Sequence, residues 1–148
     1  MKTIEAVRIT PASRETVWAL LEDAPTWAEW GMWSSVEAEG QGSQQAGAHR
    51  VLVNRPFRVR ERITEWEPGE RIGYELLEGM RVRGYRSTVT LEDAPEGGTL
   101  IRWRSVYEHA GPGTTFLLRL AVRDSCKRLA KAATDAARDE RGSSAPAG

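Results

Sequence analysis

The chain has 148 residues, with 21 basic and 21 acidic side chains, so its formal net charge is zero. This length suits one domain with a substantial core, and charges of both signs are interleaved, which excludes the one-sided basic patch that binds nucleic acid. The single cysteine excludes an internal disulfide, and the sequence has no metal-ligand spacing, signal-peptide core or apolar run near the roughly 20 residues of a membrane span. We therefore expect a cytoplasmic protein with no metal, no organic cofactor, no nucleic-acid partner and no integral membrane association.

The first 30 residues predict one strand followed by two short helices. Lys2–Thr10 alternates between two faces and is rich in residues that favour strands. Ser13 is suited to cap the first helix, and Pro25 is suited to the first turn of the second. Trp27 and Trp30 lie three residues apart, on one face of that second helix, where we expect them to anchor it by packing.

Six further strands are predicted between the short helices and the C-terminal region. They are separated by short turns rich in Gly and Pro, including one at residues 40–42, and such short spacers favour antiparallel hairpins. The predicted strands are Trp33–Glu39, Ala48–Asn54, Phe57–Trp66, Arg71–Glu78, Arg83–Leu91 and Thr99–His109.

A long helix from about Thr114 to about Arg138 closes the predicted domain. Its apolar residues recur at helical spacing. The main stripe is Leu118, Val122, Cys126, Leu129 and Ala133, and Leu117 and Ala121 widen it. Residues 1–141 are therefore expected to form a single ligand-binding domain, and residues 142–148, which are small and polar, a disordered tail.

These elements predict an α+β fold with a seven-stranded curved antiparallel sheet around the long C-terminal helix. An open sheet must cover its apolar face, and only the last helix is long enough to lie across it. A strongly bent sheet holding one helix leaves space on its concave side, so we expect an internal cavity with the two short helices at one end.

Three sequence segments resemble those of a known superfamily. VWALLED at residues 17–23, followed by WAEW at 27–30, is similar to the opening of START/Bet v 1-like (SRPBCC) helix-grip proteins. TEWEPGERIGY at 64–74 and GGTLIRW at 97–103 resemble a hairpin and a strand of its polyketide cyclase/dehydrase branch. The resemblance spans roughly Ile4 to Ala137 and implies the helix-grip fold. The superfamily includes cyclases, lipid carriers and receptors, so the fold does not select a function.

Strand alternation predicts which side chains face the cavity. On Thr99–His109 the charged residues share one face, so the other face is expected to point inward. The same reasoning applies to the neighbouring strands and to the apolar face of the long helix. The candidate ligand-binding residues are Val59, Glu61, Tyr74, Tyr85, Ser87, Trp103, Ser105, Tyr107, Leu117 and Ala121.

Glu61, Tyr107 and His109 are the candidate catalytic residues. A carboxyl group among apolar neighbours has a raised pKa and could act as a general acid or base. The alternatives are a salt bridge from Glu61 to an arginine at the sheet rim, or a bulge that turns Glu61 outward. By the alternation of its strand, His109 is expected to point inward. Cys126, in contrast, is expected to be a small buried hydrophobe rather than a nucleophile. Met80 could gate the cavity mouth, or simply lie in a hairpin loop.

Two functional hypotheses follow, both for a monomer or homodimer. In the first, the cavity binds a small hydrophobic molecule, such as a lipid, an isoprenoid or a polyketide-like compound, and the protein is a carrier or sensor. In the second, the protein is a cyclase, aromatase or dehydratase that folds a poly-carbonyl substrate in the same cavity. A protein-interaction domain on this fold is a third alternative.

Overall fold

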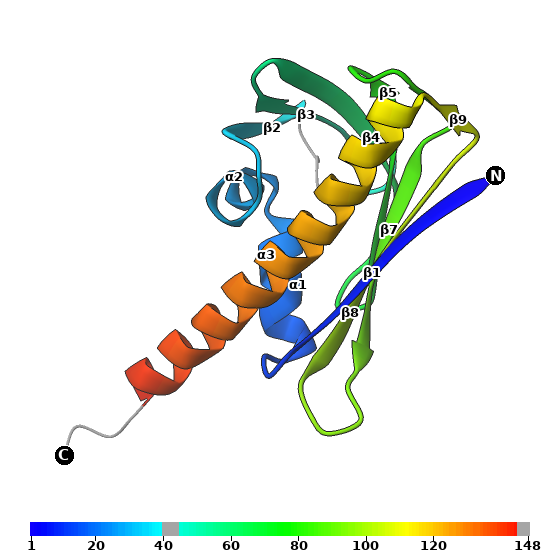
Figure 1. Ribbon diagram of the computed structural model, residues 1–148. Coiled ribbons are helices and arrows are strands. Elements are labelled where there is room, and N and C mark those ends of the chain that lie inside the picture. The colour runs from blue at the N-terminus through cyan, green and yellow to red at the C-terminus, as the bar shows by residue number, and fades with distance from the viewer. Residues whose placement is uncertain (40–44, 145–148) are drawn as a thin grey trace.

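The computed structural model describes residues 1–39 and 45–144; the predicted turn at residues 40–42 and the end of the predicted tail, 145–148, lie outside the described residues. Figure 1 shows a bent sheet with one long helix running diagonally across its concave side, and two short helices beside it. The helical segments are α1 (Arg14–Glu22), the single turn η1 (Ala24–Thr26), α2 (Trp27–Trp30) and α3 (Pro112–Ser144).

Seven strands form the main sheet. In chain order they are β1 (Lys2–Thr10), β2 (Ser35–Glu39), β3 (His49–Asn54), β4 (Phe57–Glu67), β5 (Arg71–Glu78), β7 (Arg86–Asp93) and β8 (Thr99–Tyr107). Their spatial order is β1-β8-β7-β5-β4-β3-β2, and every neighbouring pair is antiparallel. The predicted α+β architecture is confirmed: the strands from β2 to β8 follow one another across the sheet, and β8 pairs with β1, whereas the short helices connect β1 to β2 at the opposite edge.

Two small strands were not predicted, β6 (Val82–Arg83) and β9 (His109–Ala110), which pair with each other. Gly84, at a positive φ of 68°, separates β6 from β7, so the strand expected to begin at Arg83 begins at Arg86. Likewise β8 ends at Tyr107 and the chain bends before β9. This bend breaks the alternation, so the inward position expected for His109 is wrong: its side chain is exposed.

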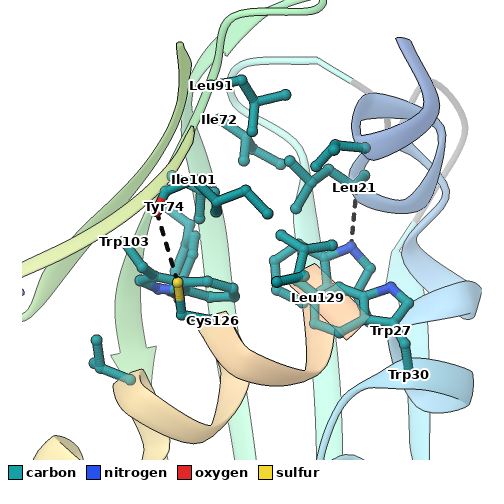
Figure 2. Close-up of a cluster of buried hydrophobic side chains, with 14 of the residues drawn as sticks. Leu21, Trp27, Trp30, Ile72, Tyr74, Leu91, Ile101, Trp103, Cys126 and Leu129 are labelled. Atoms are coloured by element: carbon teal, nitrogen blue, oxygen red, sulfur yellow. Dashed lines mark hydrogen bonds between the residues drawn. The ribbon is translucent and has the colours of Figure 1, made fainter. Parts of the chain in front are cut away.

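Helix α3 extends further than predicted at both ends. It begins at Pro112 and continues to Ser144, so residues 142–144, which were assigned to a disordered tail, are helical. Its predicted apolar stripe is confirmed: all five side chains are buried, and Cys126 and Leu129 are fully inaccessible. Figure 2 shows these two residues beside Ile101 and Trp103 of β8 in the core.

Hydrogen bonds fix the two short helices to each other. Ser13 caps α1 as predicted, because its hydroxyl accepts a hydrogen bond from the backbone N–H of Thr16 at 3.2 Å. The indole N–H of Trp27 donates to the carbonyl oxygen of Leu21 at 2.9 Å, and that of Trp30 donates to Leu20 at 3.1 Å. The tryptophan pair therefore satisfies backbone carbonyls at the end of α1.

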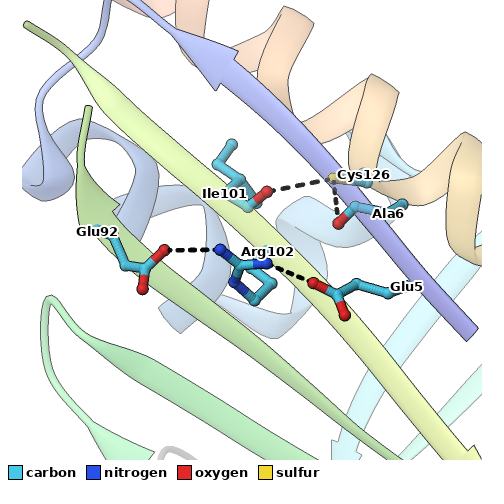
Figure 3. Close-up of polar contacts among 6 residues, drawn as sticks. All are labelled: Glu5, Ala6, Glu92, Ile101, Arg102 and Cys126. Carbon is cyan, nitrogen blue, oxygen red and sulfur yellow. Dashed lines mark hydrogen bonds and ion pairs between the residues drawn. The ribbon is translucent and has the colours of Figure 1, made fainter. Parts of the chain in front are cut away.

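The outer face of the sheet carries ion pairs that cross its strands. Arg102 on β8 binds Glu5 on β1 and, at 3.4 Å, Glu92 on β7 (Figure 3). These groups are partly exposed, so each pair contributes little to stability. Arg102 of β8 lies on the outer face, as predicted. Within the described part of the chain, no helix combines the length and apolarity needed to cross a bilayer.

Candidate ligand-binding cavity

A cavity of about 390 Å³ lies between α3, the concave face of the sheet and the segment from α2 to β2. This volume is within the range of small-molecule sites. The lining is mainly aromatic and aliphatic, and consists of Trp27, Met32, Trp33, Leu52, Phe57, Val59, Glu61, Tyr74, Leu76, Met80, Tyr85, Trp103, Leu117, Leu118, Leu120, Ala121, Val122, Asp124 and Ser125.

The lining divides into a buried floor and an exposed mouth. Trp27, Glu61 and Trp103 are almost inaccessible to solvent and belong to the floor. Phe57 and Leu120, by contrast, are 37% and 47% exposed, although both are large and apolar. Because the exposed apolar residues lie on the first turns of α3 and at the start of β4, the cavity opens at the end of the molecule where α3 begins.

The floor contains a buried ion pair between Arg50 on β3 and Glu61 on β4. The two residues face each other across the β3–β4 hairpin, and Arg50 Nε donates to Glu61 Oε1 at 3.0 Å. Both side chains are more than nine-tenths buried. The guanidinium carbon of Arg50 lies 4.0 Å from the ring centroid of Trp27 and 5.0 Å from that of Tyr74, so two aromatic faces cover the cation.

Each member of this pair keeps unused hydrogen-bonding capacity. Arg50 Nη2 is buried without a partner among residues 1–39 and 45–144, and no hydrogen bond from the described side chains or backbone reaches Glu61 Oε2. Burial raises the pKa of Glu61, whereas the charge and hydrogen bond of Arg50 oppose that rise. Glu61 itself lines the cavity, so its carboxyl group is the polar group that a ligand meets at the floor.

Next to the ion pair, three hydroxyl groups bond mainly to one another. Ser87 Oγ donates to Tyr85 Oη at 3.1 Å, and Ser105 Oγ lies 2.9 Å from Tyr85 Oη and 2.5 Å from Ser87 Oγ. The three hydroxyls can form a closed ring of hydrogen bonds in which each donates to the next, so that every hydroxyl proton has an acceptor. Tyr85 therefore presents its ring to the cavity while its hydroxyl is held by the two serines.

Tyr74 is held in a similar way. Its hydroxyl accepts a hydrogen bond from Trp103 Nε1 at 3.2 Å. Burial, with the nearby Tyr85 and Glu61, raises the pKa of Tyr74 well above its ordinary value, and burial likewise raises the pKa of Tyr85. Both phenols stay protonated at neutral pH, so they can hold a ligand by hydrogen bonds or ring contacts but do not act as bases.

Most of the predicted site residues lie around this cavity. Those that line it are Val59, Glu61, Tyr74, Tyr85, Trp103, Leu117 and Ala121. Ser87, Ser105 and Tyr107 are buried, but they lie outside the lining. Ser87 and Ser105 support Tyr85 from behind, and the Tyr107 hydroxyl donates to Thr115 of α3 at 3.4 Å.

The three candidate catalytic residues do not converge. Glu61 lies at the cavity floor, Tyr107 bonds to α3, and His109 is exposed on β9. The salt bridge weighed for Glu61 exists, but it lies inside the fold rather than at the sheet rim. Cys126 is a buried hydrophobe, as predicted, and burial raises the pKa of its thiol to about 11. In the described ranges no group of three or more His, Cys, Asp or Glu side chains could hold a metal ion.

Sequence reasoning missed two important contributors, Arg50 and Trp27. Trp27 anchors its helix as predicted, but the same ring also lines the cavity and covers Arg50. Arg50 was missed because no inward face was assigned to its strand. Its signal was the hairpin turn at Arg55-Pro56: Arg50 and Glu61 are equally far from that turn, and so oppose each other.

The bent antiparallel sheet, the long helix across it and the apolar cavity between them define a helix-grip protein with an internal ligand cavity. The chain belongs to the family described as polyketide cyclase/dehydrase and lipid transport, whose model matches residues 1–137. No curated protein matches the chain.

Three solved structures share the fold at low sequence identity. The protein XoxI from Bacillus cereus is 21% identical, with a TM-score of 0.77 over 93% of this chain and 99% of that one. A protein from Nitrosospira multiformis is 20% identical, with the same TM-score and the same coverage of both chains. An uncharacterised protein from Bacillus thuringiensis is 16% identical, with a TM-score of 0.70 over 90% of this chain and 98% of that one. At these identities the likeness concerns the fold.

Proposed function

We propose that the protein binds a small, largely apolar molecule in the cavity and acts as its carrier or sensor. The observation that carries this proposal is the cavity of about 390 Å³, whose lining is apolar apart from a few polar groups. Each 100 Å² of apolar ligand surface removed from water contributes about 2.5 kcal/mol to binding. A lipid, an isoprenoid or a polyketide-like compound supplies that kind of surface. The cytoplasmic location and the monomeric or homodimeric state remain expectations from the sequence.

The second candidate is an enzyme of the cyclase, aromatase or dehydratase kind. The observation in its favour is Glu61, a carboxyl group with a raised pKa at the cavity floor. Such chemistry needs several polar groups at one point, and of the three candidate catalytic residues only Glu61 lines the cavity. This separation favours a carrier or sensor. Mass spectrometry distinguishes the two: a carrier releases its co-purified molecule unchanged, whereas an enzyme converts an added poly-carbonyl substrate.

Filling the cavity tests the proposed binding. Ala121 lies on the cavity side of α3 and is half-buried, so Ala121→Trp places an indole in the cavity at a helix-propensity cost below about 0.7 kcal/mol. We expect the affinity for the neutral fluorescent compound N-phenyl-1-naphthylamine to fall at least about tenfold, which is about 1.4 kcal/mol, with the melting temperature nearly unchanged. Lys127→Trp, on an exposed position of the same helix, is the matched control. Unchanged binding by Ala121→Trp, or no binding by the wild type, would refute the proposal.

A further inference from the structure

The charges around the cavity restrict what can bind there. The charged side chains that line it are both acidic: Glu61 at the floor and Asp124 on α3, which pairs with Arg128 at 2.7 Å. No Lys, Arg or His from the described ranges lines the cavity. Arg50 lies next to it, but its charge is already balanced by Glu61. A ligand whose anionic head group reaches the floor would therefore bring an uncompensated negative charge into a buried site, which is strongly unfavourable.

The hydrogen-bonding groups at the floor restrict the ligand further. The protons of Tyr85, Ser87 and Ser105 are used within their own ring, and the indole N–H of Trp103 is used by Tyr74. Glu61 Oε2, by contrast, receives no hydrogen bond from the described part of the chain. Arg50 favours the ionised carboxylate by binding its other oxygen, and an ionised carboxylate only accepts hydrogen bonds. The unpaired Arg50 Nη2 does not line the cavity, whereas Tyr74 does and can donate its own phenolic proton. The group that completes the floor is therefore an uncharged donor that can also accept, such as a hydroxyl.

We propose that the ligand is an uncharged amphiphile with a hydroxyl group. The hydroxyl end lies at the floor and donates a hydrogen bond to Glu61, and the apolar remainder of the ligand extends toward the mouth. This inference rests on the proposed function, since it specifies the ligand of the same cavity. The orientation follows from the lining: the acceptor is at the buried floor, and Phe57, Leu117 and Leu120 are exposed at the mouth. A ketone or ester without a hydroxyl lacks the donor, and a fatty acid at neutral pH carries the wrong charge.

The test compares three ten-carbon compounds as competitors of N-phenyl-1-naphthylamine at neutral pH: 1-decanol, 2-decanone and decanoate. We expect 1-decanol to bind at least about tenfold more tightly than decanoate. We expect it to bind at least about threefold more tightly than 2-decanone, because its hydroxyl donates to the charged Glu61 and a hydrogen bond to a charged group is stronger than one between neutral groups. Equal binding of 1-decanol and decanoate by the wild type would overturn the inference while leaving hydrophobic binding intact. Failure of the fluorescent compound itself to bind would remove both proposals.

Variants of the ion pair make the test specific to Glu61. In Glu61→Gln the Arg50 charge is no longer balanced, so we expect the preference to reverse in favour of decanoate. Glu67→Gln makes the same substitution at an exposed position of the same strand, and we expect it to keep the wild-type order. If Glu61→Gln fails to fold, the double variant Arg50→Met/Glu61→Leu removes both charges, and we expect it to bind 1-decanol and 2-decanone equally. A tenfold preference for 1-decanol over decanoate that persists in Glu61→Gln would contradict the assignment. So would a threefold preference for 1-decanol over 2-decanone that persists in the double variant.

Discussion

The buried ion pair allows a prediction about stability that needs no ligand. Arg50→Met leaves Glu61 buried without its cation, in contact with apolar and aromatic neighbours. Breaking such a pair from one side costs about 3–5 kcal/mol of unfolding free energy. For a chain of this size that loss lowers the melting temperature by about 10–15 °C. The assay is urea unfolding followed by tryptophan fluorescence, because several of the six tryptophans lie in the core.

The loss of stability in Arg50→Met should depend on pH, and the ionisation of Glu61 determines whether that loss grows or shrinks as the pH falls. Without Arg50 the two influences that lower the pKa of Glu61 disappear, and burial raises it further. A carboxyl group whose pKa is higher in the folded than in the unfolded state destabilises the fold when ionised, and this penalty is relieved as the pH falls through the raised pKa. The relief is at most about 1.4 kcal/mol per pH unit. The other titratable groups that face Glu61, Tyr74 and Tyr85, stay neutral because burial raises their pKa values. The gap between Arg50→Met and wild type should therefore shrink from about pH 8 to about pH 6.

Two further variants isolate the pair. Arg60→Met removes a partly exposed ion pair between β4 and Glu39 of β2, across the intervening strand β3, and should cost less than about 1 kcal/mol. Arg50→Met/Glu61→Leu removes both buried charges and should recover most of the stability lost in the single variant. A penalty for Arg50→Met below about 1 kcal/mol, or one that does not change with pH, would refute the reasoning.

Two other predictions concern the core and the cavity mouth. Cys126 should resist alkylation by iodoacetamide in the native protein at about pH 8, because its thiol is buried and, with a pKa of about 11, is ionised in only about one molecule per thousand. Labelling of the folded protein as rapid as that of a urea-unfolded control would contradict this prediction. Gly79→Ala should destabilise the protein by at least about 1 kcal/mol more than Gly69→Ala, as measured by urea unfolding. Both glycines have positive φ, but a Cβ at Gly79 would overlap the carbonyl oxygen of Arg58, whereas one at Gly69 meets nothing within 4 Å. Equal losses would show that the close approach at Gly79 does not matter.

The regular elements could be predicted from the sequence because their signals are local. Arg71–Glu78 was predicted with both ends correct, since alternation and flanking turn residues mark it without reference to other strands. The apolar stripe of α3 likewise follows from helical spacing alone. The parts that were missed depend on distant partners: β6 and β9 are two residues long and exist only because they pair with each other. The exposed position of His109 follows from that pairing.

Strand alternation predicts which side chains of the candidate site point to the inner face of the sheet. Parity placed Val59, Tyr74 and Trp103 on the inner face, and all three line the cavity. Parity does not distinguish residues that reach open space from those behind them, which is why Ser105 and Tyr107 were grouped with the lining. Whether an inward side chain reaches the cavity depends on the size and position of its neighbours across the fold, and the sequence of one strand does not contain that information.

The buried ion pair links the stability of the fold to the selectivity proposed for the cavity. Stability alone does not account for the pair, because apolar residues of similar volume can replace a buried ion pair without loss. What the pair adds is a hydrogen-bond acceptor fixed at the cavity floor without net charge: Arg50 holds one oxygen of Glu61 and balances its charge, while Trp27 covers the cation. An acceptor of this kind favours a neutral donor over an anion, which an apolar floor cannot do. If the reasoning holds, Arg50→Met/Glu61→Leu will recover most of the stability lost in Arg50→Met and still bind apolar compounds, but it will no longer distinguish an alcohol from a ketone.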